Sequence, residues 1–157
     1  MKMEIIQPFM DAADAVLGHN LRCPTRMDDL RMDAWHLRRQ GIAAVVSLQG
    51  DIEGRIVLDL SPETACKMAK EFAQGEADVA PLAQDIVCEL ANQVIGNAVT
   101  ALNDCGYRFR VQPPEISTAD PIPSSANTEA LLMIFDTESG PVFLNIALRA
   151  AKAYAAD

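Results

Sequence analysis

The sequence predicts an α+β domain in which long helices pack on an antiparallel sheet. Residues 82–105 form an amphipathic run between Pro81 and Gly106, which are typical start and stop signals of a helix. Two mostly apolar segments, each interrupted by a glycine-containing turn, indicate two β-hairpins. The chain has 157 residues, half of them apolar, which is enough to bury a core without disulfides. We therefore expect a single domain over residues 1–157.

The chain begins with a predicted helix. Apolar residues recur near period 3.6 over residues 5–19, and Gly18 stands near the end of that pattern. Residues 20–41 combine mixed charge with Pro24 and Trp35. Their pattern leaves three interpretations open, which are an extended strand, a short helix and a flexible arm.

A hairpin and a second helix follow. Residues 42–60 have the pattern of two strands around a turn with a glycine at each end, Gly50 and Gly54. The segment 61–63, Ser-Pro-Glu, supplies a helix cap, a first-turn proline and an acid near the positive end of the helix dipole. This predicts a helix over residues 62–74.

The second half of the chain repeats this plan. After the helix at 82–105 we expect a strand over 107–111 and a proline-rich loop over 113–127. A second hairpin is expected over 129–148, with its turn at 137–140.

The two halves, roughly residues 4–75 and 78–150, resemble each other. The first helix aligns with the long one, and the hairpins align at an offset of 86 residues without a gap. The aligned segments are residues 11–18 with 89–96, and residues 44–58 with 130–144. This predicts an internal helix–hairpin duplication with pseudo-twofold symmetry. Where the second copy has Glu89 and Asn92, the first has Asp11 and Asp14.

The helix at 82–105 carries a narrow polar stripe. Asp85, Glu89, Asn92 and Gly96 follow spacings that place them on one side of an α-helix. Opposite them lies a broad apolar side made of Val87, Leu90, Ala91, Val94, Ala98, Ala101 and Leu102. By pattern alone, an ordinary solvated face is the first interpretation of such a stripe.

Two residues count against that interpretation. Asn92 is a poor helix former in mid-helix because its side chain competes for backbone hydrogen bonds. Gly96 costs about 1 kcal/mol relative to alanine in a helix interior. Asn97, beside it, is expected at the boundary of the buried side as a structural hydrogen-bonding residue.

Charge and composition exclude several classes of function. The net charge of −9 argues against nucleic acid or an anionic membrane as the main partner. No apolar run reaches the length of a membrane span, and the N-terminal residues lack the core of a signal peptide, so we expect a cytoplasmic protein. The cysteines and histidines show no zinc-like spacing. They are Cys23, Cys66, Cys88, Cys105, His19 and His36.

The pattern Asp85-x3-Glu89-x2-Asn92-x3-Gly96-Asn97, on a long helix within a helix–hairpin duplication, resembles the CheC/CheX/FliY family of chemotaxis phosphatases. The single motif makes the chain most similar to CheX. The resemblance covers nearly the whole chain, and the motif is fairly specific in this context. The family's downstream proline has a counterpart in the Pro113-Pro114 pair, one or two positions early.

The resemblance implies a phosphatase that acts on the aspartyl phosphate of a CheY-like receiver domain, and so ends a chemotaxis or other two-component signal. Asn92 would orient the hydrolytic water, and Glu89 would pair with the receiver's active-site lysine. Asp85 and Gly96 would contact the partner, with Asn97 as structural support. The family also implies a homodimer without a metal site or cofactor of its own, because the magnesium ion belongs to the receiver.

The chemistry of an amide suits this role. Its carbonyl oxygen accepts a hydrogen bond from water while its NH2 group donates to a nearby oxygen, and a loose phosphoryl-transfer transition state needs no strong base. Two other functions remain open. One is a non-catalytic receiver-binding or adaptor module of the same fold. The other, a small-molecule enzyme with Glu89 or Asp85 as general base, finds no supporting histidine or nucleophile motif.

Overall fold

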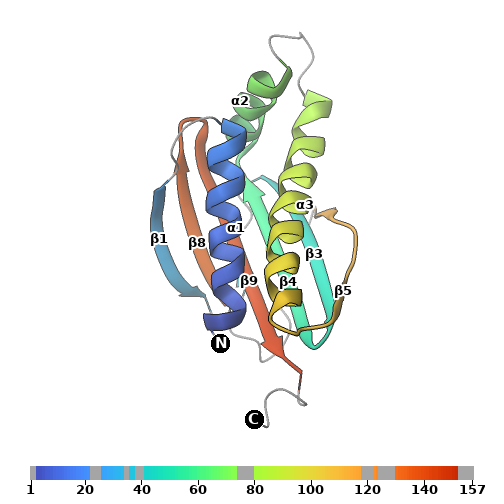
Figure 1. The fold of residues 1–157 in the computed structure, drawn as a ribbon. Coiled ribbons are helices and arrows are strands. Elements are labelled where there is room, and N and C mark those ends of the chain that lie inside the picture. The colour runs from blue at the N-terminus through green and yellow to red at the C-terminus, as the bar shows by residue number, and fades with distance from the viewer. Residues whose placement is uncertain are drawn as a thin grey trace.

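The computed structural model describes residues 3–21, 26–33, 36–37, 41–73, 80–117, 122–123 and 130–151. Within these residues there are three helices, α1 (Met3–Leu21), α2 (Pro62–Ala73) and α3 (Ala80–Asp104). Figure 1 shows α1 and α3 side by side across one face of a sheet, with α2 above one end of it. The predicted α+β class and the three predicted helices are confirmed.

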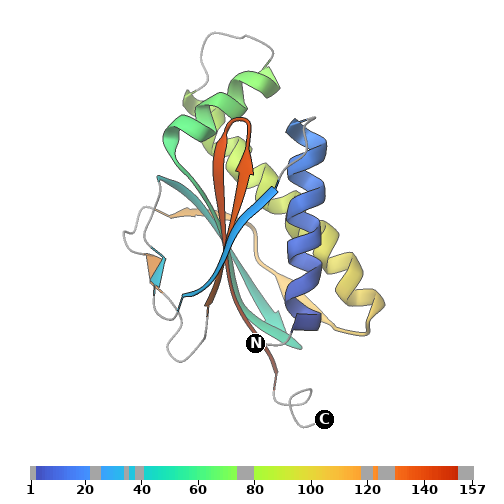
Figure 2. The same cartoon turned by 90° about the vertical axis from the view of Figure 1, so that its left-hand side faces the viewer.

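The sheet is antiparallel throughout its described pairs. Its strand order is β1-β8-β9-β4-β3-β5, and β6 also pairs with β3. A separate pair joins β2 to β7; in Figure 2 it lies on the side of the sheet away from α1 and α3. The strands are β1 (Arg26–Asp33), β2 (His36–Leu37), β3 (Ile42–Gly50), β4 (Ile52–Leu60), β5 (Phe109–Val111), β6 (Glu115–Ser117), β7 (Ile122–Pro123), β8 (Ala130–Thr137) and β9 (Gly140–Ala150).

The helix termini follow the sequence signals. At the start of α2, the backbone N–H of Thr64 donates to Ser61 Oγ at 3.1 Å, so Ser61 is the predicted cap. At the end of α3, Gly106 has a φ of 98° and the N–H of Tyr107 donates to the carbonyl of Leu102 at 3.1 Å. This turn uses Tyr107, and the strand predicted from residue 107 therefore begins at Phe109.

Pairing between strands that are distant in sequence determines the structure of the segments that the local pattern left open. Of the three interpretations of residues 20–41, the extended one holds for 26–33 and 36–37, because β1 pairs with β8 and β2 pairs with β7, whereas residues 20–21 are the end of α1. The predicted loop over 113–127 holds for residues 113–114 but is wrong for 115–117 and 122–123, since β6 pairs with β3 and β7 pairs with β2. Residues 22–25, 34–35, 38–40, 118–121 and 124–127 of these segments, and the residues after 151, lie outside the described residues.

The two hairpins differ in register from the alignment made on the sequence. The first closes at Leu48 opposite Gly54, and the second closes at Thr137 opposite Gly140, so the first turn is three residues longer. The offset of 86 is therefore wrong for the first strand of each hairpin. Val46 lies opposite Ile56 as Phe135 lies opposite Val142, although Val46 and Phe135 are 89 residues apart. The internal duplication and its pseudo-twofold axis stay predictions.

No helix among the described residues is long and apolar enough to cross a membrane.

Candidate functional site

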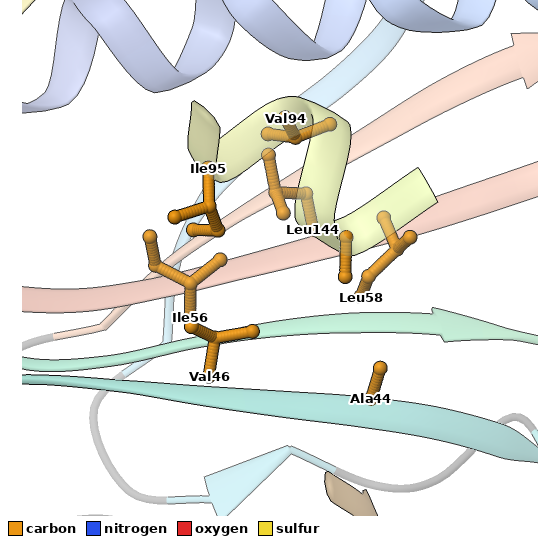
Figure 3. A pocket seen from close by; sticks show the side chains of 8 residues that line it. Ala44, Val46, Ile56, Leu58, Val94, Ile95 and Leu144 are labelled. Carbon is orange, nitrogen blue, oxygen red and sulfur yellow. The ribbon is translucent and has the colours of Figure 1, made fainter. Parts of the chain in front are cut away.

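The helix α3 is fixed to the sheet by close packing along its inner side. Val94 and Ile95 lie against Ile56, Leu58 and Leu144, which come from the central strands β4 and β9 (Figure 3). No space for a water molecule remains between these side chains. A helix packed in this way cannot rotate or slide without opening cavities, which cost several kcal/mol in protein cores. Whatever α3 carries on its outer side is therefore held in a fixed direction.

The outer side carries the predicted polar stripe. Asp85, Glu89, Asn92 and Gly96 are all exposed, whereas Val87, Leu90, Ala91, Val94, Ala98 and Leu102 are buried. The separation of the two faces is thus confirmed except at one position. Ala101 was placed on the apolar side, but it is exposed and faces the first helix across a groove.

A neighbouring amide holds the carboxylate of Glu89. Gln93 Nε2, one turn further along α3, donates to Glu89 Oε1 at 3.1 Å. This contact orients one carboxylate oxygen and leaves the other without a partner among the described residues. Gln93 was not singled out from the sequence, although its spacing of four residues from Glu89 is a detectable signal.

Asn92 and Gly96 present open surface. The side-chain amide of Asn92 makes no hydrogen bond within the described part of the chain, so both its acceptor and its donors are available. A Cβ atom placed on Gly96 would meet nothing within 4 Å. No packing among the described residues therefore requires glycine there, although glycine costs about 1 kcal/mol relative to alanine in a helix interior.

A groove separates α1 from α3 beside Gly96. It has a volume of about 390 Å³ and is lined by Glu4, Gln7, Pro8, Asp11, Ala12, Ala15, Asn97 and Ala101. Asn97 is therefore exposed in the groove. The sequence pattern had predicted it at the boundary of the buried side. Its side chain makes no hydrogen bond to the described residues, and its structural role stays a prediction. On the α1 side of the groove, Gln7 Nε2 donates to Asp11 Oδ1 of the same helix at 2.9 Å.

The Cys88 thiol beside the stripe is not activated as a nucleophile. Burial raises the pKa of the Cys88 thiol, and the nearby Asp85 carboxylate raises this pKa further. The thiol is therefore protonated at neutral pH and unsuited to attack. In the described part of the chain, no three His, Cys, Asp or Glu side chains come together as a metal site. The chemistry left to α3 is that of hydrogen bonding and charge, with a carboxylate and a free amide one turn apart.

Solved structures of CheC-like and CheX proteins have the same fold as this chain. The chain is similar to a CheC-like superfamily protein from Shewanella sp. PV-4, with a TM-score of 0.81 and 18% identity over 96% of this chain and 100% of that one. It is also similar to the chemotaxis protein CheX from Desulfovibrio desulfuricans, with a TM-score of 0.76 and 21% identity over 94% of this chain and 99% of that one. These likenesses establish a CheC-like fold.

A family model and a relative of higher sequence identity show the family. The family model for the chemotaxis phosphatase CheX matches residues 42–138, which include the whole stripe on α3. The chain is 30% identical to a protein in the CheX–CheY–BeF3–Mg²⁺ complex from Borrelia burgdorferi, with a TM-score of 0.68 over 92% of this chain and 97% of that one. The chain belongs to the CheX family of chemotaxis phosphatases. A comparison with curated proteins gives no match.

Proposed function

We propose that this protein hydrolyses the aspartyl phosphate of a CheY-like receiver domain. The observation that carries the proposal is the pair of Asn92 and Glu89 on the outer side of α3. The amide is exposed and unpaired within the described residues, and the carboxylate one turn away is held by Gln93 at 3.1 Å. A rigid helix that presents these two groups has what is needed to place one water molecule in line with a phosphorus atom.

Each residue of the stripe then has a separate task. Asn92 accepts a hydrogen bond from the attacking water and donates to an oxygen of the phosphoryl group. Glu89 pairs with a lysine of the receiver and so fixes the angle of α3 in the partner's active site. Asp85, one turn before Glu89, adds a docking charge at the edge of the contact, and Gly96 allows the two backbones to approach closely.

The comparisons support the choice of partner. The Borrelia relative was crystallised with CheY, BeF3 and Mg²⁺, and a metal in that complex is consistent with a magnesium ion brought by the receiver. In our proposal the chain needs no cofactor of its own, because the metal neutralises phosphoryl charge from the partner's side. We also propose a homodimer, as the family resemblance implies, with each protomer carrying one complete stripe.

Phosphate release separates this proposal from a receiver-binding module without activity. A phosphorylated receiver, with magnesium, is mixed with a small fraction of its molar amount of this protein, and free phosphate is followed with time. We expect each molecule of protein to release many equivalents of phosphate faster than the receiver does alone. A module that only binds leaves the rate of release unchanged or slows it, and that result would refute the proposal.

Gly96→Ala is expected to have opposite effects on stability and activity. The new methyl group meets open space, so the free energy of unfolding should rise by about 1 kcal/mol, which moves the melting temperature up by about 3 °C. The same methyl group stands in the contact with the receiver, so KM should rise. Thermal unfolding and steady-state phosphate release measure the two effects. A stabilised variant with unchanged KM would show that Gly96 lies outside the contact.

The counterparts of the stripe on α1 are expected to have no catalytic task. Asp11 and Asp14 are exposed acids where the stripe has Glu89 and Asn92, and neither can act as an amide. The double variant Asp11→Ala with Asp14→Ala should keep kcat within about twofold of the parent, which is the usual size of surface effects. Phosphate release at saturating receiver is the measurement. A loss of about 100-fold, the scale typical of a lost positioning group, would mean that α1 forms a second active site.

A further inference from the structure

A second surface lies at the far end of α3, away from the stripe. It is a hollow of about 600 Å³ lined by Gln49, Gly50, Asn103, Arg108, Phe109 and Arg110. Asn103 is eleven residues beyond Asn92, or about 16 Å along the helix axis. Two arginines meet here in a chain whose net charge is −9. The hollow is therefore a local basic site on an acidic protein.

The guanidinium of Arg108 is held in place by neutral groups. Its Nη1 donates to the backbone carbonyls of Asn103 and Tyr107, each at 3.0 Å. Its backbone N–H donates to Asp51 Oδ2 at 2.7 Å, which fixes the main chain at the rim of the hollow. Carbonyls orient the guanidinium without cancelling its charge. The Nε and Nη2 edge has no partner among the described residues, and this edge is the one that receives a carboxylate through two parallel hydrogen bonds.

Arg110 contributes a second charge that is not compensated. It is exposed and makes no hydrogen bond or ion pair with the described residues. Arg149 is a useful contrast, because it is also exposed but its Nη2 pairs with Glu53 Oε2 at 3.0 Å. The arginines of the hollow are thus available to an anion, whereas Arg149 on β9 is already paired with the Glu53 carboxylate.

The strand beside the hollow has a free edge. The N–H of Gln112 donates to Ser47 O, and the N–H of Asp51 donates to Arg108 O, so residues 108, 110 and 112 point their backbone groups at β3. By the alternation of an antiparallel ladder, the N–H and C=O groups of Phe109 and Val111 point the other way. No described strand pairs with them there. The side chain of Val111 is 36% exposed at the same edge.

We propose that this site binds an extended acidic segment of a partner protein. The segment adds to the outer edge of β5 through the backbone groups of Phe109 and Val111, and its carboxylates reach Arg108 and Arg110. A second copy of this chain is a poor occupant, because pairing β5 with itself would bring the arginines of two protomers together. The site is separate from α3's polar stripe, and the proposal does not depend on the phosphatase activity.

Peptide binding tests the proposal. A fluorescein-labelled peptide of alternating glutamate and threonine is titrated with the parent protein at low salt, next to a peptide in which lysine replaces glutamate. We expect the acidic peptide to bind and the basic one not to, although the overall charge of the protein favours the opposite. Arg110→Gln should weaken binding about fivefold or more, and Arg149→Gln should leave it unchanged. Slower amide exchange at Phe109 and Val111 on peptide addition would show pairing at the edge.

Four results would overturn the proposal. The first is stronger binding of the basic peptide, and the second is equal loss in Arg110→Gln and Arg149→Gln, which would indicate an unspecific charge effect. The third is displacement of the peptide by inorganic phosphate without any change at Phe109 and Val111, which would indicate a small-anion site. The fourth is a dimer of the parent that Arg110→Gln dissolves, which would make a second copy the occupant. Because Arg110 has no partner in the described fold, its variant should fold normally, and thermal unfolding checks this.

Discussion

Replacing Asn92 by alanine should reduce phosphate release from a phosphorylated receiver by a factor of about 100 or more, the scale typical of a lost positioning group. The reason is local to one side chain. The amide is exposed on α3 and makes no hydrogen bond to the described residues, so its removal disturbs no packing. The fold and the affinity for the receiver should therefore be retained, and steady-state kinetics should show the loss in kcat.

Asn103→Ala is the matched control for this variant. It removes an exposed asparagine side chain from the same helix, about three turns beyond Asn92. Its kcat should equal that of the parent. If Asn92→Ala also turned over at the parental rate, Asn92 would not be the group that orients the water, and the function assigned to the stripe would have to be abandoned.

Glu89→Gln should weaken association with the receiver by about 2 kcal/mol, which is close to thirtyfold in Kd. The substitution keeps the shape and an oxygen that accepts from Gln93 Nε2, but it removes the charge that pairs with the receiver's lysine. The affinity of the variant should therefore fall less steeply with salt than that of the parent. Hydrolysis should also slow, because α3 would no longer be held at the angle that places Asn92.

Titration into a receiver that carries beryllofluoride, at low and moderate salt, measures both effects. Asp104→Asn is the control, since it removes the same charge from the exposed last residue of α3. Equal affinity and equal salt dependence for Glu89→Gln and the parent would mean that Glu89 is an ordinary solvated residue.

The sequence predicted those parts of the fold that local signals determine. Ser61 and Gly106 mark the termini of helices because capping is a property of a few consecutive residues, and both ends lie where the residues placed them. The stripe on α3 was predicted because helical periodicity separates Asp85, Glu89 and Asn92 from the buried face. Their exposure in the structure agrees with this separation.

Long-range pairing could not be predicted in the same way. Residues 115–117 have no strong strand pattern, and they are extended because β3 offers them an open edge. The gapless alignment of the two hairpins failed because turn length sets register, and the turns differ by three residues. At the site, the exposure of Asn97 and Ala101 depends on the groove left by α1, which no pattern within α3 reveals.

Paramagnetic broadening tests most directly whether α3 meets the receiver's phosphoryl site. Manganese replaces magnesium in a beryllofluoride-loaded receiver, and the amide signals of this protein are recorded on mixing. We expect broadening centred on residues 89–96 of α3, strongest at the side-chain amide of Asn92 and weaker at residues 11–14 of α1. Broadening centred on another surface, with the signals of residues 89–96 unaffected, would contradict it.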